Sequence, residues 1–175
     1  MKTILSICLL LLPATAARAQ TDAPEDPVVS SLRGLHDITA NYVLQAAEML
    51  DDDMYAFRAT EDVRTTGQLL AHIVGAQYMF CSIAAGEENP SPVNYEAEAT
   101  TKDDILAALR ASLEYCGNVY DNLTDEEGAE VRNLFGMPMA ASAVLAFNSA
   151  HNFEHYGNIV TYMRLNDLVP PSSMQ

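Results

Sequence analysis

Four long segments of this 175-residue chain carry apolar side chains at helical spacing and contain no proline. They span residues 29–50, 65–85, 101–123 and 142–165. Apolar residues that recur every three or four positions line one face of an α-helix, and that face must be buried against another element. No stretch of any length alternates between apolar and polar residues, and no glycine-rich phosphate loop is present. The sequence therefore predicts an all-α protein that folds as a single four-helix bundle.

Long polar linkers separate the four helices, at residues 51–64, 87–100 and 124–139. Thr65 followed by Gln68 is a capping box that begins the second helix, and Gly86 is a natural stop at its end. A linker of about 14 residues reaches about 45 to 50 Å, and a helix of about 20 residues is about 30 Å long. Linker length alone therefore leaves the helix directions open. We expect the bundle to occupy residues 29–171, followed by a short tail at 172–175.

The first helix carries an apolar stripe that we expect to face the core. This stripe contains Leu32, Leu35, Ile38 (or Thr39), Tyr42, Ala46 and Met49. His36 falls beside the stripe rather than within it, so we interpret it as a surface or boundary histidine.

The first nineteen residues have the pattern of an export signal. Lys2 is followed by an apolar run at 4–12, which is too short to span a bilayer, and then by Pro13. The A-x-A site at 17–19 comes directly before Gln20. We expect a signal peptide at 1–19, a mobile lead-in at 20–28 and an exported bacterial protein, periplasmic or secreted. A short buried helix is the alternative for 1–19. No other segment is expected to cross a membrane.

The formal net charge of the chain is −15. Removal of the first nineteen residues would make it more negative, because Lys2 and Arg18 lie there. Nucleic acids and anionic lipid surfaces require a basic patch, so neither is an expected partner. Solubility and favourable charges at helix starts are sufficient reasons for the acidic side chains.

Histidines in two of the predicted helices could bind a metal ion. His151 and His155 are four residues apart, so both imidazoles project from one face of the last helix and can hold one divalent cation. Without a metal, this pair would be a polar step in a helix interface. His72, in the second turn of the second helix, borders its apolar stripe and is the candidate third ligand.

Residues 151–155 also match H-x-x-E-H, the inverted signature of zinc proteases. Asn152 stands where the HExxH enzymes carry their glutamate, and only twenty residues follow His155, which is too few for the downstream glutamate ligand of the inverted proteases. Both departures argue against the protease interpretation, which casein cleavage that is lost in Glu154→Gln would revive. Glu154 is the nearest ionisable neighbour of the pair, but it lies about 60° from His151 around the helix axis. It is a weak candidate for a catalytic base.

Two segments, GQLLAHIVGAQYMFC (67–81) and HNFEHYGNIVTYMRLNDLVPP (151–171), resemble the DinB/YfiT-like superfamily, and YAFRATEDVR (55–64) fits it too. The resemblance implies an up-down-down-up bundle in which the second and third helices are parallel. It also implies a divalent metal site, often nickel or zinc, at His72, His151 and His155, and frequent homodimers. Relatives with a known activity include thiol-dependent transferases and isomerases.

Two cysteines test this implied topology. Cys8 falls in the export signal, while Cys81 lies 16 residues after Thr65 and Cys116 lies 15 after Thr101. In a parallel pair of helices the two thiols would stand at nearly the same height, and export would supply an oxidising compartment. We expect them to be bonded or in contact. Two reduced, buried cysteines are the alternative.

The predicted site indicates two classes of function. Three imidazoles leave a cation with open positions, where a water or a thiol could be activated. We therefore expect a metal-dependent hydrolase or thiol transferase that acts on a small-molecule substrate. The alternative is a non-catalytic, stress-related bundle that binds a metal or a ligand. The absence of an obvious fourth ligand favours the enzyme, and the absence of a clear general base favours the alternative.

Overall fold

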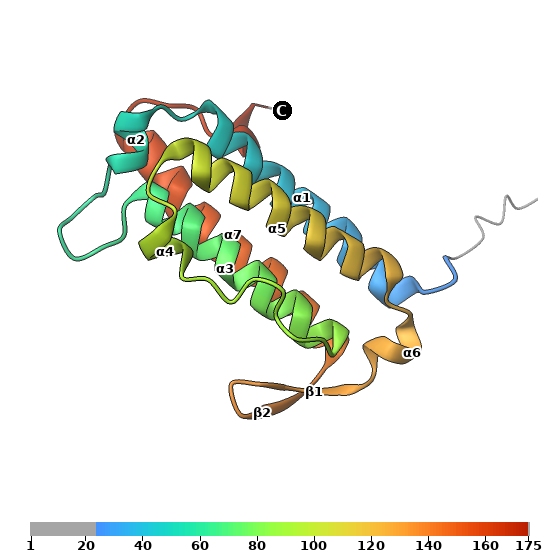
Figure 1. Cartoon of the computed structure of the whole chain (residues 1–175). Helices are drawn as coiled ribbons and strands as arrows, with labels where there is room; N and C mark the ends of the chain where they lie inside the picture. The colour runs from blue at the N-terminus through green and yellow to red at the C-terminus, as the bar shows by residue number, and fades with distance from the viewer. Residues whose placement is uncertain (1–23, 175) are drawn as a thin grey trace, which may run out of the picture.

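The computed structural model describes residues 24–174, so the predicted signal peptide lies outside the described residues. Four long helices pack side by side (Figure 1). They are α1 (Pro27–Met49), α3 (Thr66–Ala85), α5 (Lys102–Asn122) and α7 (Ala141–Leu165). The predicted all-α four-helix bundle is confirmed.

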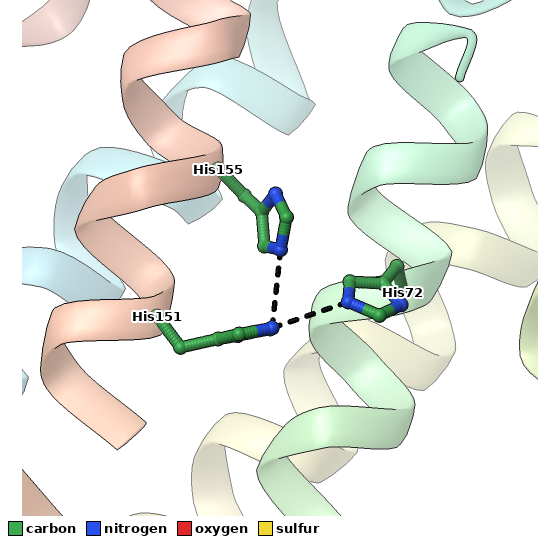
Figure 2. Close-up of side chains that lie close together, drawn as sticks. All are labelled: His72, His151 and His155. Carbon is green, nitrogen blue, oxygen red and sulfur yellow. Dashed lines mark hydrogen bonds between the residues drawn. The ribbon is translucent and has the colours of Figure 1, made fainter. Parts of the chain in front are cut away.

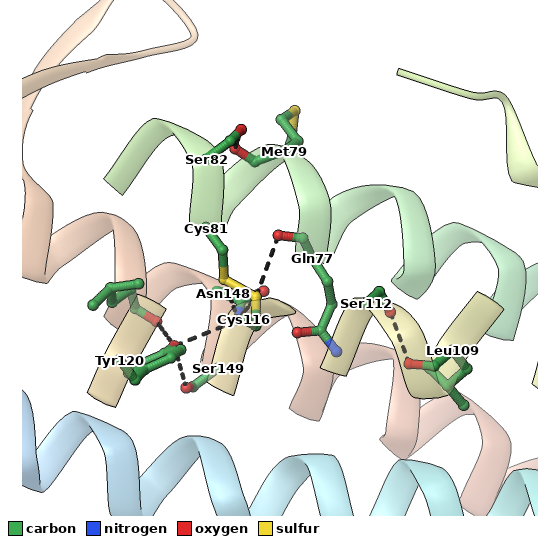
Figure 3. Close-up of a disulfide and its surroundings, with 11 residues drawn as sticks. Gln77, Met79, Cys81, Ser82, Leu109, Ser112, Cys116, Tyr120, Asn148 and Ser149 are labelled. Carbon is green, nitrogen blue, oxygen red and sulfur yellow. Dashed lines mark hydrogen bonds between the residues drawn. A yellow bond between two sulfur atoms is a disulfide. The ribbon is translucent and has the colours of Figure 1, made fainter. Parts of the chain in front are cut away.

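The helix directions follow the up-down-down-up order. Both α1 and α3 pack against α5 and α7, so α1 and α3 lie on one diagonal of the bundle. In Figure 1, α3 and α5 run in the same direction, opposite to α1 and α7. The Cys81–Cys116 disulfide ties this parallel pair together, with 5.4 Å between the two Cα atoms. Figure 3 shows Asn148 of α7 beside the two sulfur atoms.

Each linker contains short ordered elements. These are α2 (Asp52–Ala56), α4 (Tyr95–Glu98), α6 (Asp125–Gly128), β1 (Val131–Leu134) and β2 (Met137–Ala140). The two strands form an antiparallel hairpin in which Val131 pairs with Ala140 and Leu134 with Met137. We did not expect any strand, because four-residue strands are too short to show an alternating pattern. Phe135 and Gly136 at the tip both have positive φ, 53° and 83°, as in the turns that match the twist of a hairpin.

The central helix α3 begins and ends as its sequence predicts. The Thr65 hydroxyl accepts from the Gln68 amide, the Gln68 side chain accepts from the Thr65 amide, and Gly86 ends the helix with φ 74°. By length and composition α3 could also cross a membrane, which we did not expect of any segment after residue 19. The core helix of a bundle passes the same test, and most of α3 is buried, largely against α5 and α7.

The buried face of α1 differs from the predicted stripe. Leu35, Ile38 and Met49 are exposed, whereas Val29, His36, Thr39, Val43, Ala46 and Ala47 are buried. The buried stripe contains several small side chains, which allow the helix axes to approach closely. The packing of α1 against α5 and α7 therefore buries this stripe rather than the adjacent one that we predicted. The expectation that His36 lies at the surface is wrong. Its side chain is 1% exposed and stacks on Tyr120, with 4.5 Å between ring centroids.

Secondary structure extends beyond the predicted bundle, residues 29–171, at both ends of the described chain. Helix α1 begins at Pro27, inside the predicted lead-in at 20–28, and proline suits the first turn of a helix. The Asp125 carboxylate accepts hydrogen bonds from the amides of Val28 and Val29, at 3.1 and 2.8 Å. At the other end, a 3-10 helix η1 (Pro171–Ser173) overlaps the predicted tail, and the amide of Ser172 donates to the Tyr156 hydroxyl.

Candidate metal centre

The structure brings His72, His151 and His155 together between two helices (Figure 2). His72 projects from α3, and His151 and His155 project from successive turns of α7. One ring nitrogen of each lies within 4.8 Å of the other two. The Nε2 atom of His151 is 3.1 Å from Nε2 of His72 and 3.1 Å from Nε2 of His155. The rings therefore converge on a common point.

The surroundings of the two α7 histidines favour their neutral forms. Burial, followed by the proximity of His155 and His72, lowers the pKa of His151 to about 4. Burial, followed by the proximity of His72, also lowers the pKa of His155. A neutral imidazole carries a lone pair on one ring nitrogen, which is the form that ligates a metal ion.

Glu96, which the sequence did not single out, supports this site. Its Oε1 atom lies 2.8 Å from Nδ1 of His72, and Arg64 Nε donates to its Oε2 at 2.8 Å. Burial acts to raise the pKa of Glu96, but the hydrogen bonds from Arg64 and His72 outweigh it and lower the pKa. A carboxylate on the second nitrogen of a metal-binding histidine sets the tautomer and the ring orientation.

No spacing in the sequence links Glu96 to His72. Glu96 lies on α4, a four-residue helix within the linker at 87–100, and 24 positions separate it from His72. Its acidic character was visible, but acidic residues are frequent in every linker of this chain. The relation depends on the path of the linker over α3.

The hydrogen-bonding pattern fits a bound cation. In a neutral His72 ring whose Nδ1 donates to Glu96, Nε2 carries a lone pair. Nε2 of His151 can then donate to His72 or accept from His155, but it cannot do both, so one 3.1 Å contact lacks a hydrogen. The buried Nδ1 atoms of His151 and His155 also have no hydrogen-bond partner. A cation shared by three Nε2 lone pairs would remove the conflict at Nε2.

A pocket of about 630 Å³ opens beside the histidines. His72 and His151 form part of its wall, and most of the remaining wall is apolar. Glu154, the weak candidate for a catalytic base, is exposed on α7 and does not line this pocket. Its charge reaches the site only by raising the pKa of His155 against the larger effects that lower it.

The fold is a four-helix bundle in which three imidazoles converge between two facing helices, and two of them line a pocket. This arrangement is a candidate site for a divalent metal. The chain belongs to the DinB superfamily, whose sequence pattern it matches over residues 35–159. The uncharacterized protein YjoA of Bacillus subtilis strain 168 is 26% identical over 127 residues, which cover 71% of this chain and 81% of YjoA. The predicted resemblance is thereby confirmed.

Solved structures share the fold. The crystal structure of YjoA superimposes with a TM-score of 0.64 at 20% identity, and it covers 79% of this chain and 93% of that one. A DinB-like protein from Bacillus cereus ATCC 10987 gives a TM-score of 0.70 at 18% identity, with 81% and 95% covered. The mycothiol-dependent maleylpyruvate isomerase gives 0.64 at 15% identity, with 75% of this chain but only 60% of the isomerase covered.

Proposed function

We propose that this protein is a metal-dependent enzyme that acts on a small molecule, with His72, His151 and His155 as ligands of one divalent cation, nickel or zinc. The observation that carries the proposal is the convergence of three imidazoles, two of which, those of His72 and His151, line the wall of a pocket. Within residues 24–174, no fourth His, Cys, Asp or Glu joins this cluster. Structural zinc sites fill all four positions with protein ligands, whereas catalytic sites keep one position open.

Of the two expected reactions, thiol transfer fits the site better than hydrolysis. A cation bound there would lower the pKa of a water or a thiol at the open position. Hydrolysis also calls for a general base, and Glu96 is already held by Arg64 and His72. A thiolate is itself a strong nucleophile and needs no such base. The structural likeness to an isomerase that is mycothiol-dependent by name supports the same choice.

The residues of the chain have separate roles in this proposal. His151 and His155 stay neutral and supply lone pairs, and Glu96 holds the His72 ring in position. The pocket beside them holds the substrate and excludes water from it. We also propose export to the periplasm or medium, which the disulfide supports because disulfides persist in oxidising compartments. The predicted homodimer stays a prediction, which light scattering can test.

A metal analysis combined with an activity panel tests the function. The purified protein is loaded with nickel or zinc and assayed with thiols plus an aromatic electrophile, and separately with ester and amide substrates. We expect thiol conjugation at least about tenfold above that of His151→Ala. Metal binding without activity would favour the non-catalytic alternative, which the lack of a free general base supports. A protein that binds no metal would overturn the proposal.

A further inference from the structure

The pocket beside the histidines is walled mostly by uncharged side chains. Its apolar wall includes Met79 and Phe80 of α3, Val93 of the second linker, Phe135 of the hairpin tip and Phe147 of α7. Among the described residues that line it there is no Lys or Arg, and one carboxylate, that of Glu96, is present. The volume of about 630 Å³ lies within the range of pockets that hold small molecules.

The single carboxylate in the wall is already paired, so it offers no free charge to a ligand. Glu96 already forms an ion pair with Arg64, at 2.8 Å, and contacts His72. An anionic group placed in the metal-free pocket would lose its hydration and meet no Lys or Arg side chain in the wall. Binding of an apolar group would be favourable, because it removes the apolar surface of the group and that of the pocket wall from water. The pocket therefore favours an uncharged, apolar occupant.

The mouth of the pocket carries two exposed aromatic rings. Phe135 is 64% exposed and Phe147 is 42% exposed, and both rings lie close to the buried Phe80, with centroids 6.1 and 5.3 Å away. Phe135 also has a φ of 53°, a left-handed conformation that is costly for a side chain other than glycine. The Phe135 ring on this strained turn is only partly buried in the free protein. Contact with an apolar ligand would supply that burial.

We propose that this pocket selects substrates through an uncharged, apolar group, such as an alkyl chain or a fused aromatic ring, which it holds beside the three histidines. Phe135 and Phe147 would contact this group at the mouth. The role of that group as part of a substrate rests on the proposed function. The preference for uncharged over anionic occupants depends only on the wall of the pocket.

Dye displacement in the metal-free protein tests the preference. N-phenyl-1-naphthylamine is neutral and apolar, and its fluorescence rises in apolar surroundings. We expect saturable binding, and we expect decanol to displace the dye at a concentration at least about tenfold lower than decanoate. The protein is stripped of metal with a chelator first, so that no cation attracts the carboxylate. No dye binding, or equal displacement by the two competitors, would overturn the inference.

A larger side chain that fills the pocket tests whether the dye binds there. Gly75 lies in the pocket wall on α3, and an added Cβ would meet only Tyr95 Cδ2, at 4.0 Å. The substitution Gly75→Leu therefore extends a side chain into the pocket and suits a helix better than glycine. Gly157→Leu is the matched control, because Gly157 is on α7 outside the pocket and its Cβ would meet nothing within 4 Å. We expect dye affinity to fall at least about tenfold in Gly75→Leu and to be unchanged in Gly157→Leu. Equal affinities in the two variants would place the dye elsewhere and overturn the assignment.

A positive charge added to the pocket wall tests the reason for the preference. Val93 is 38% exposed and lies outside the helices, so Val93→Arg adds a cation to the wall without altering the core. We expect the ratio of decanoate to decanol affinity to rise at least about tenfold in Val93→Arg and to stay low in Val93→Gln. An unchanged ratio in Val93→Arg would contradict selection by charge.

Metal content, measured on the same preparations, separates this inference from the proposed function. A protein that binds the dye as expected but never binds metal would retain the apolar pocket and lose the metal-dependent reaction. If the protein binds metal and transfers thiols but its dye affinity is unchanged by Gly75→Leu, the proposed reaction stands and the assignment of this pocket is wrong.

Discussion

Oε1 of Glu96 lies 2.8 Å from Nδ1 of His72 and thereby joins a four-residue linker helix to the predicted metal centre. When Nδ1 of a neutral His72 ring is the donor in this contact, Nε2 carries the lone pair that can ligate a metal ion. Arg64 holds the other side of the carboxylate. The orientation of one predicted ligand therefore depends on a chain segment outside the four main helices.

Replacing Glu96 by alanine is expected to weaken metal binding about 10- to 100-fold, the usual effect of losing the partner of a ligating histidine. Competition with a chelator of known affinity measures the change. Glu154→Ala is the control, because Glu154 is an exposed acidic residue on α7 that does not line the pocket. Equal losses in the two variants would assign the effect to overall charge rather than to the contact with His72.

Replacing His72, His151 or His155 by alanine is expected to reduce the metal content to a small fraction of that of the parent protein. Elemental analysis after gel filtration measures it. A metal at 100 times its dissociation constant should stabilise the parent fold by about 2.7 kcal/mol, and this gain should disappear in each variant. His36→Phe removes a histidine outside the site and should keep full metal content. Full metal content in any of the three alanine variants would remove that histidine from the ligand set.

Acid is expected to destabilise the fold through His36. Burial, followed by the charge of Arg33, lowers the pKa of His36 to about 4, whereas the unfolded chain binds this proton near pH 6.5. The unfolded state holds more protons between these values, so the free energy of unfolding falls as the pH falls through this window. Between pH 7 and pH 5, His36 alone should lower the free energy of unfolding by about 2 kcal/mol.

Urea denaturation at pH 7 and pH 5 measures this loss. The variant His36→Phe, which keeps a ring against Tyr120, should lose less stability over the same interval. A pH dependence identical to that of the parent protein would show that His36 is not the group responsible.

Loss of the Cys81–Cys116 disulfide is expected to lower the free energy of unfolding by about 3 kcal/mol. The bond closes a loop across a sequence separation of 35 residues, and the open unfolded chain gains the corresponding entropy, for which loop closure alone gives an upper value of about 4 kcal/mol. Denaturation with and without a reducing agent measures the change. The double variant Cys81→Ala, Cys116→Ala is the control, because its stability should not respond to the reductant. An equal response in both proteins would mean that the reductant acts elsewhere.

The four main helices were predictable almost to the residue. The helix predicted at 65–85 forms as Thr66–Ala85, and the one at 142–165 forms as Ala141–Leu165. These boundaries depend on local signals, namely caps, glycine stops and apolar spacing. The burial of His36 was not predictable in this way, because α1 carries two adjacent stripes and only its contact with α5 and α7 selects one.

The sequence by itself determined the helices and the shared face of His151 and His155, because a separation of four residues fixes their relative direction within one helix. It also marked His72 as a candidate, but not its distance from the pair. Tertiary structure decided that distance, the partner Glu96 and the position of Phe135 at the pocket mouth. These residues lie on different helices and linkers, and their relative positions follow from packing between elements, which no local spacing encodes.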